Sequence, residues 1–243
     1  MLKSFIKNSA KRRGYEILGP SRAFATERSL AGLLRQQRVN LVLDVGANTG
    51  QFADELRASG YTGRIVSFEP LTSAHSELCR KAVAYSNWTI ADRTAIGAEA
   101  GSIKIHISGN SVSSSILDML PRHSEAAPQS IYVSSETAPV NRLDDLCTLA
   151  SDDRTLLKID VQGYERQVVE GAQHTLGTCC AVICEMSLSP LYEGQSLAME
   201  LWALLAARGF EPWSLEPGFR DPVTGRMLQL DGFFVRRGEA AIL

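Results

Sequence analysis

Apolar and polar positions alternate along the chain in two different periods. Short apolar runs, typical of strands buried on both faces, are followed by segments in which apolar residues recur at helical spacing. The predicted strands cover 41–45, 64–68, 88–91, 156–160 and 181–184, and the predicted helices cover 29–35, 51–59, 73–84, 163–176 and 197–208. Two last strands, over 210–215 and 226–237, flank the turn sequence DPVTG and are predicted to form an antiparallel hairpin. This order indicates an α/β fold with a doubly wound, mostly parallel sheet.

The sequence 41–52, LVLDVGANTGQF, joins the first strand to a helix through a glycine-containing turn. Gly46 and Gly50 have no Cβ atom, so a ligand can approach this backbone closely, and the N–H groups of the following helix favour an anionic group. Asp44, at the carboxyl end of the strand, favours a ligand that is also positively charged. S-adenosylmethionine has these properties, because it carries an ammonium, a sulfonium and a carboxylate. Its candidate ligands here are Asp44, Gly46, Ala47, Asn48, Gly50 and Phe52.

A second acidic residue follows the second predicted strand. Glu69 lies 19 residues after Gly50 and is followed by Pro70. At this spacing a carboxylate accepts hydrogen bonds from the two ribose hydroxyls of an adenosyl cofactor. The spacing also suits NAD, so a nucleotide-dependent oxidoreductase is an alternative. The turn reads G-A-N-T-G rather than G-x-G-x-x-G, which disfavours that alternative.

Several sequence blocks in the same order resemble class I S-adenosylmethionine-dependent methyltransferases, and the FkbM family in particular. The blocks are VLDVGANTGQF (42–52), SFEP (67–70), TAIG (94–97), LLKIDVQGYE (156–165), EMSLSPLYEGQ (185–195) and LQLDGFFVR (228–236). The resemblance implies a Rossmann-like, seven-stranded, mostly parallel sheet with a C-terminal antiparallel hairpin. It also implies O-methylation of a carbohydrate, and adenine contacts just past the third strand, at Asp92 or Arg93. A surface turn is the alternative for those two residues.

Methyl transfer from a sulfonium needs the donor and acceptor in line, and a hydroxyl acceptor must also lose a proton. Asp160, at the end of the fourth strand and beside the first, is the first candidate for the base, and Glu185 is the second. Lys158 either orders the site or is structural. The histidines at 106, 123 and 174 are more often non-catalytic, and Asp231 interrupts the last strand. Many family members have glutamate where this chain has Gln162, so no metal is assigned.

Two regions extend the predicted domain at 41–243. Residues 1–40 form a helical lead-in whose first 13 residues combine five basic side chains with Leu2, Phe5 and Ile6. This pattern suits either a helix that covers the sheet edge or a basic amphipathic helix at an anionic membrane surface. The insertion at about 108–140 is rich in serine and contains three prolines, so we expect irregular structure that acts as a lid or acceptor wall.

Composition and charge restrict the class of protein. The 243 residues are 44% hydrophobic and carry a net charge of −2, which suits one globular domain and argues against a general nucleic-acid binder. Five cysteines, an odd number, favour a reduced cytoplasm over a disulfide framework. Cys180 and Cys184 have the spacing C-x-x-x-C, but Ser187 stands where an iron–sulfur site would need a third cysteine. We expect a cytoplasmic enzyme, or one peripheral to the inner membrane face, that acts on a small-molecule or glycolipid sugar. A non-catalytic cofactor-binding scaffold is the alternative.

Overall fold

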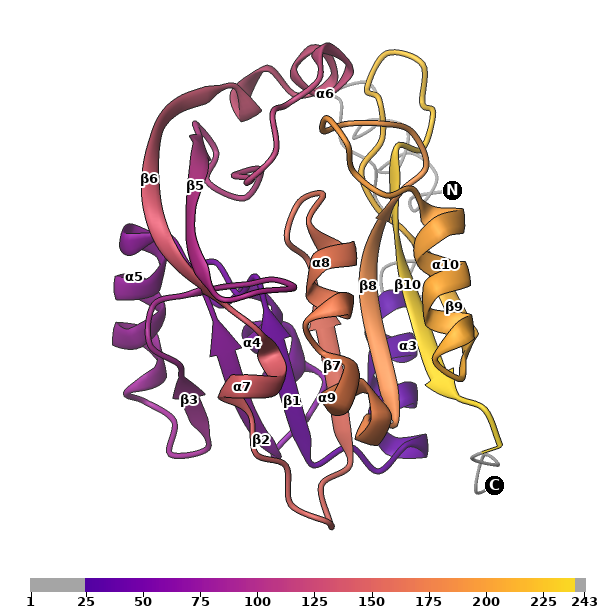
Figure 1. The fold of residues 1–243 in the computed structure, drawn as a ribbon. Helices are drawn as coiled ribbons and strands as arrows, with labels where there is room; N and C mark the ends of the chain where they lie inside the picture. Colours follow the sequence, from indigo (N-terminus) through magenta and orange to yellow (C-terminus); the bar gives the residue numbers. More distant parts are fainter. Residues whose placement is uncertain (1–24, 239–243) are drawn as a thin grey trace, which may run out of the picture.

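The main sheet has seven strands in the order β3-β2-β1-β7-β8-β10-β9 (Figure 1). The computed structural model describes residues 25–238, and their side chains from residue 29 on. The strands are β1 (Leu41–Val45), β2 (Arg64–Phe68), β3 (Trp88–Ile90), β7 (Thr155–Ile159), β8 (Ala181–Ser187), β9 (Phe210–Pro217) and β10 (Gln229–Arg236). Strand β1 pairs in parallel with β2 and β7, whereas β10 runs antiparallel between β8 and β9. The predicted doubly wound sheet with its C-terminal hairpin is confirmed.

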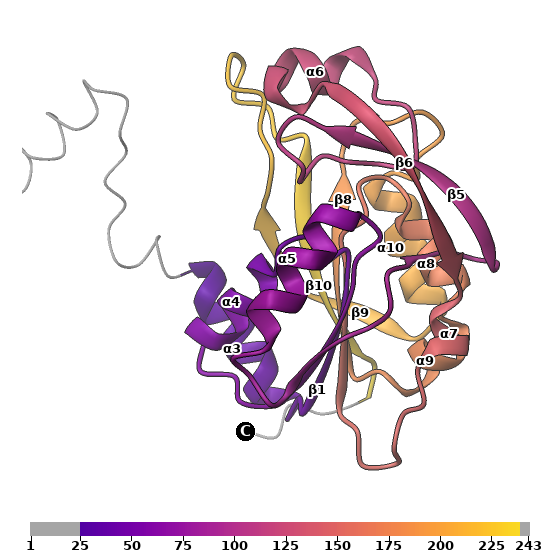
Figure 2. The same ribbon diagram turned by 90° about the vertical axis from the view of Figure 1, so that its left-hand side faces the viewer.

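Helices cover both faces of this sheet (Figure 2). One layer contains α3 (Ala25–Gln36), α4 (Gln51–Ala58) and α5 (Thr72–Ala82), and the other contains α7 (Leu143–Leu146), α8 (Glu165–Glu170), α9 (Gln173–Thr178) and α10 (Ala198–Ala207). Neighbouring residues of a strand point to opposite layers: Val42 packs in the core under α3–α5, and Leu43 packs in the core under α8–α10. Because both faces are buried, the strands are apolar at nearly every position.

The single helix predicted over 163–176 is two short helices, α8 and α9. At Gly171 the backbone lies against that of Gly97, so close that a Cβ atom would be 1.9 Å from the Gly97 carbonyl oxygen. Asp144 then accepts hydrogen bonds from the backbone N–H groups of His174 and Thr175, at 3.0 and 2.8 Å. Helix α8 therefore ends where Gly171 contacts Gly97, and α9 begins where Asp144 accepts from its first free N–H groups.

The insertion contains more regular structure than its serine and proline content predicts. Its last part belongs to β6 (Tyr132–Asn141), which pairs antiparallel with β5 (Gly101–Ser108) and parallel with β4 (Ala95–Ile96) in a second sheet. Between β5 and β6, the 109–131 segment contains α6 (Pro121–Ala126) and the short 3₁₀ helix η1 (Pro128–Ser130). In Figure 1, β5, β6 and α6 arch over the edge of the main sheet at which the parallel strands end.

Two further expectations concern disulfide bonds and contact with a membrane. None of the five cysteines, all within the described residues, forms a disulfide, and those at 179, 180 and 184 are buried. Between residues 25 and 238, no helix is both long enough and apolar enough to cross a membrane. The basic N-terminal segment at 1–13 lies outside the described residues.

Candidate active site

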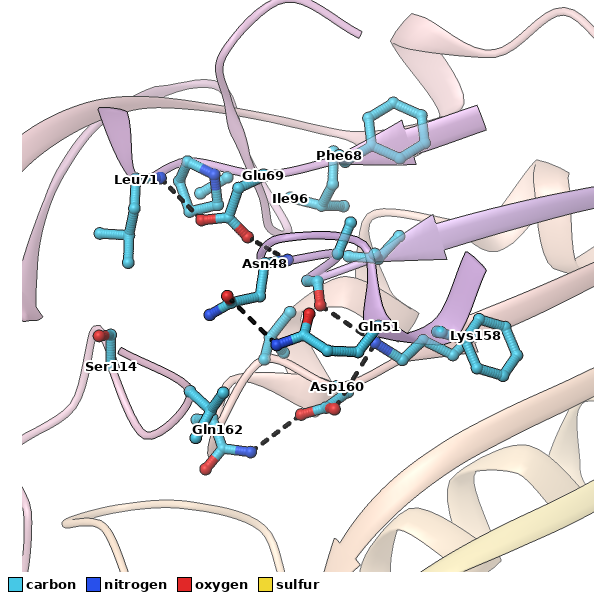
Figure 3. A pocket seen from close by; sticks show the side chains of 18 of the residues that line it. Asn48, Gln51, Phe68, Glu69, Leu71, Ile96, Ser114, Lys158, Asp160 and Gln162 are labelled. Carbon is cyan, nitrogen blue, oxygen red and sulfur yellow. Dashed lines mark hydrogen bonds and ion pairs between the residues drawn. The ribbon is translucent and has the colours of Figure 1, made fainter. Parts of the chain in front are cut away.

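A cavity of about 310 Å³ lies between the carboxyl ends of the parallel strands and the 109–131 segment (Figure 3). This is the edge at which open α/β sheets bind their ligands. Its lining combines the turn after β1, the residues after β2 and β7, and the near side of the 109–131 segment. The lining residues used below are Gly46, Ala47, Asn48, Gln51, Phe52, Glu55, Glu69, Pro70, Val112, Ser114, Ser115, Lys158, Asp160, Gln162 and Asp231.

The turn after β1 requires both of its glycines. Gly46 has φ +79°, and a Cβ atom there would lie 1.8 Å from the carbonyl oxygen of Asp160. Gly50 has φ +90°, and a Cβ there would lie 2.7 Å from the Trp88 ring. Asn48 also takes a positive φ, +47°, so the backbone curls tightly between the two glycines. This curl brings the turn against the end of β7 and places Ala47 and Asn48 in the cavity wall.

Glu69 is held by backbone donors from two sides. Only 3% of the residue is exposed, and its carboxyl oxygens accept hydrogen bonds from the N–H groups of Asn48, at 2.8 Å, and Leu71, at 2.9 Å. Burial raises the pKa of Glu69 to about 7, although both hydrogen bonds act in the opposite direction. Each carboxyl oxygen can accept a second hydrogen bond, so the side chain can still accept from a pair of ligand hydroxyls.

Lys158 joins the ends of β1 and β7. Its ammonium lies 3.2 Å from Asp44 Oδ1 and 3.5 Å from Asp160 Oδ2, and donates to the Gly46 carbonyl at 3.0 Å. Burial alone would lower the pKa of Lys158, but the charges of Asp44 and Asp160 outweigh burial and raise it. Lys158 is therefore a fixed cation and does not accept a proton at neutral pH. Asp44 is completely buried beneath it and does not line the cavity.

Asp160 and Glu185 are connected through one amide group. Gln162 donates from Nε2 to Asp160 Oδ1 at 2.9 Å and to Glu185 Oε2 at 2.6 Å. Asp160 lines the cavity, whereas Glu185 lies behind it and accepts a further bond from Gln229 at 2.8 Å. Burial, with Asp160 and Asp231 nearby, raises the pKa of Glu185 well above its usual range. Glu185 does not line the cavity, so Asp160 is the better placed of the two candidate bases.

Glu185 was expected at the end of its strand, and this expectation is wrong. Strand β8 continues to Ser187, because β10 pairs with it as far as Gln229 opposite Ser187. Asp231 lies directly opposite Glu185 in this pairing, and Asp231 lines the cavity although Glu185 does not. Burial, and next the nearby charge of Asp160, raise the pKa of Asp231 to about 6.

The structure does not place Asp92 or Arg93 in the cavity wall. Arg93 donates to the Pro70 carbonyl at 2.7 Å and lies 3.5 Å from the Glu136 carboxylate, so it ties the turn after β2 to β6. Thr94 and the two residues after it line the cavity instead. The histidines at 106, 123 and 174 are not among the lining residues, and burial lowers the pKa of His123 to about 4. Sequence reasoning missed Glu55, although it follows Gln51 by one helical turn and therefore shares its face of α4.

The sequence model of the Methyltransferase FkbM domain matches residues 44–212, which include the whole glycine turn, Glu69 and Asp160. The chain belongs to the FkbM methyltransferase family. The 2-O-methyltransferase NoeI of Sinorhizobium fredii (strain NGR234) is 27% identical to this FkbM methyltransferase over 186 residues, which cover 72% of this chain and 74% of NoeI. Two solved structures with similar folds, each with a TM-score of 0.48, are the magnesium protoporphyrin IX methyltransferase of Synechocystis PCC 6803 with bound S-adenosylmethionine and an rRNA methylase of Streptococcus thermophilus. The first is 13% identical and the match covers 87% of this chain and 78% of that one; the second is 10% identical, with 90% and 98% covered.

The polar groups that line the cavity fit S-adenosylmethionine, the cofactor of this FkbM methyltransferase. Glu69 keeps free acceptor capacity for the ribose hydroxyls, and Gly46, Ala47 and Asn48 present the turn to the cavity, whereas Gly50 packs against Trp88 and does not line it. When bound, the cofactor supplies a methyl group activated by its sulfonium. The carboxyl groups of Glu55, Asp160 and Asp231 line the cavity. Among the described residues, Lys158 is the only lysine or arginine that lines it. This excess of acidic groups favours a ligand of net positive charge.

Proposed function

We propose that this methyltransferase methylates a hydroxyl group of a sugar, carried on a glycolipid or a secondary metabolite. The observation that supports this most is the position of Asp160. Its carboxyl group is 36% exposed, lines the cavity, and is held by Lys158 on one oxygen and by Gln162 on the other. A sugar hydroxyl is a weak nucleophile that needs a nearby base, whereas an amine acceptor needs less help. The name of NoeI, a 2-O-methyltransferase, also supports an oxygen acceptor.

The proposed reaction is a single displacement. A lone pair of the acceptor oxygen forms the bond to the methyl carbon while the carbon–sulfur bond breaks, and its electrons return to sulfur. The hydroxyl proton passes to Asp160. Lys158, 3.5 Å from Asp160 Oδ2, keeps this carboxyl group oriented between turnovers. Most of the remaining work is alignment of donor and acceptor and exclusion of water.

The 109–131 segment is proposed to form the acceptor wall. Val112, Ser114 and Ser115 line the cavity from the side opposite the glycine turn, and Val112 is half exposed. Ile116 also lines the cavity, and a wall with two apolar residues and two hydroxyls can contact both the ring and the hydroxyls of a sugar. Limited proteolysis tests this role: cleavage within the segment that neither cofactor nor acceptor slows would contradict it.

We also propose a cytoplasmic location and contact with a membrane surface through residues 1–13. The five cysteines, none of which forms a disulfide, support the location, and the basic residues of the segment support the membrane contact. If deletion of residues 1–13 leaves binding to anionic liposomes unchanged, membrane contact through this segment is refuted.

The acceptor is tested by incubating the protein with S-adenosylmethionine labelled in its methyl group. The panel contains free sugars, oligosaccharides and glycolipids as hydroxyl acceptors, and amino sugars and amines as nitrogen acceptors. We expect a label on oxygen, located by mass spectrometry after hydrolysis, and its loss in Asp160→Asn. Transfer to nitrogen acceptors alone would overturn the proposal.

A further inference from the structure

Gln162 has a strained backbone conformation and lies next to Asp160, the candidate base. It is a non-glycine residue with φ +54°, in the left-handed region that side chains other than glycine rarely adopt. Such strain persists where surrounding contacts hold the residue in place. The contacts in this case come from the neighbouring Asp160, from the 185–192 stretch and from Ser115.

The first contacts use both hydrogens of the side-chain amide. Nε2 donates one to Asp160 Oδ1 at 2.9 Å and the other to Glu185 Oε2 at 2.6 Å. An amide nitrogen has two hydrogens, so both are used. Carboxylate oxygens only accept, so the amide must present its nitrogen, and not its oxygen, to this pair.

The second contact fixes the orientation of the amide. The Tyr192 hydroxyl donates to Gln162 Oε1 at 2.8 Å, and only 1% of Tyr192 is exposed. Its ring packs over Gly163, where a Cβ atom would lie 3.1 Å from the ring, and the ring of His123 lies edge-on to it with the two centroids 5.1 Å apart. Because the tyrosine ring is packed in place, its hydroxyl prevents the amide from turning over.

The third contacts reach the 109–131 segment. Ser115 Oγ donates to the backbone carbonyl of Gln162 at 2.6 Å, and the Tyr192 hydroxyl lies 3.3 Å from the Ser113 carbonyl. Ser115 also lines the cavity, as do Ser114 and Gln162, which are labelled in Figure 3. A shift of this segment would therefore move both ends of Gln162.

We propose that Gln162 is a positioning residue, which together with Tyr192 holds the Asp160 and Glu185 carboxyl groups in place and connects Asp160 to the acceptor wall. Glutamine has a donor for each carboxyl group and an acceptor for the tyrosine. A glutamate in its place would have neither N–H donor, and its negative charge would repel the two carboxyl groups. The inference rests on the proposed function only in treating Asp160 as the base.

Several other charged groups face this pair and enter any measurement of pH dependence. They are Asp44 on β1, Glu55 on α4, Lys158 on β7, Glu165 on α8 and Asp231 on β10. Comparisons are therefore made between variants that leave all of these groups unchanged.

The first test needs no acceptor. The titration of Glu185 is followed by carbon-13 NMR of labelled glutamate carboxyls, with its signal assigned through Glu185→Gln. In Gln162→Glu we expect this titration to move up by about one pH unit, because a donor is replaced by a like charge. Tyr192→Phe should move it in the same direction by less. Two matched controls carry the same changes elsewhere: Gln173→Glu at an exposed position of α9, and Tyr61→Phe, which removes a hydroxyl that donates to the Arg64 carbonyl.

The second test measures turnover on the hydroxyl acceptor that the labelled panel identifies. Gln162→Glu and Tyr192→Phe should lower kcat by roughly tenfold or more, while KM for S-adenosylmethionine stays within about twofold. An unmoved Glu185 titration in a folded Gln162→Glu variant refutes the inference, whatever the acceptor is. If Tyr192→Phe does not fold, Gln162→Glu alone decides. A shifted titration with methylation of nitrogen alone supports the positioning role and overturns only the proposed function.

Discussion

Glu69→Gln is a sharp test of the cofactor site, because it changes one carboxyl oxygen and almost no volume. In the wild type the two oxygens accept from the Asn48 and Leu71 N–H groups, at 2.8 and 2.9 Å. Glutamine has one acceptor oxygen, so one of these N–H groups loses its partner. The residue is 3% exposed, and a buried donor without a partner costs about 1–3 kcal/mol of stability.

Glu69→Gln should also weaken cofactor binding, separately from its effect on the stability of the fold. A hydrogen bond from a ribose hydroxyl to a charged acceptor contributes about 1.5–3 kcal/mol, so its loss weakens binding roughly 10- to 150-fold. Isothermal titration with S-adenosylhomocysteine measures this change without turnover. The exposed Glu77→Gln on α5 is the matched control and should bind like the wild type.

The pH dependence of affinity gives a second, independent measure. In the cofactor-free protein the pKa of Glu69 is raised to about 7, chiefly by burial. Below that pH the carboxyl group is protonated and must lose its proton before it can accept from both hydroxyls. Wild-type affinity should therefore fall as pH decreases through 7, by up to about tenfold per pH unit, whereas this dependence should be absent in Glu69→Gln.

A ligand variant completes the test. The 2′-deoxyribose analogue of S-adenosylhomocysteine should bind the wild type more weakly than the parent, and should show a smaller difference in Glu69→Gln. Equal binding of the two ligands to the wild type would show that Glu69 does not hold the ribose, and would refute the reasoning.

Three further predictions follow from the same geometry. Asp160→Asn should lower kcat by about 10²- to 10⁴-fold and leave affinity for S-adenosylhomocysteine within about twofold, because the residue removes a proton rather than binding the ribose; weaker binding with unchanged kcat would contradict this. Gly46→Ala should destabilise the fold by more than about 2 kcal/mol in urea unfolding, because the new Cβ would lie 1.8 Å from the Asp160 carbonyl oxygen at φ +79°; a wild-type midpoint would contradict the turn. Because burial lowers the pKa of His123 from 6.5 to about 4, its contribution to stability is present above pH 6.5 and is lost as pH falls towards 4. His123→Phe should reduce this acid dependence in unfolding measured between pH 4 and 7, and an unchanged slope would exclude His123 as its source.

The central part of the fold could be predicted because its signals are local. Strands buried on both faces must be apolar along their whole length, so β1, β2 and β7 are visible as short apolar runs. The carboxyl ends of β1 and β7 could be predicted to lie side by side, because strand order reverses between these strands in a doubly wound sheet. This rule placed Asp160 beside the glycine turn before any contact was known.

The features that sequence reasoning missed depend on distant partners. Strand β8 is longer than its apolar run because β10 pairs with its polar end, so Glu185 lies inside the strand. Gln162 is oriented by Tyr192, which is 30 residues away, and contacts Ser115, which is 47 residues away. Arg93 follows β3 as expected, but the Pro70 carbonyl and Glu136 draw its side chain away from the cavity. No local pattern specifies these partners.

The two halves of the site are held by different kinds of contact, and this difference has a functional consequence. On the β1–β2 side, Glu69 is fixed by backbone N–H groups and the turn by its glycine geometry. On the β7–β8 side, Lys158 holds one oxygen of Asp160, but the other oxygen and Glu185 Oε2 are held by a side-chain amide whose own position depends on Ser115 and Tyr192. Backbone contacts within the sheet edge do not need the 109–131 segment, but the amide does. We infer that the cofactor half is formed before the acceptor arrives, and that an acceptor pressing on the 109–131 segment acts on the position of the base as well as on its own alignment.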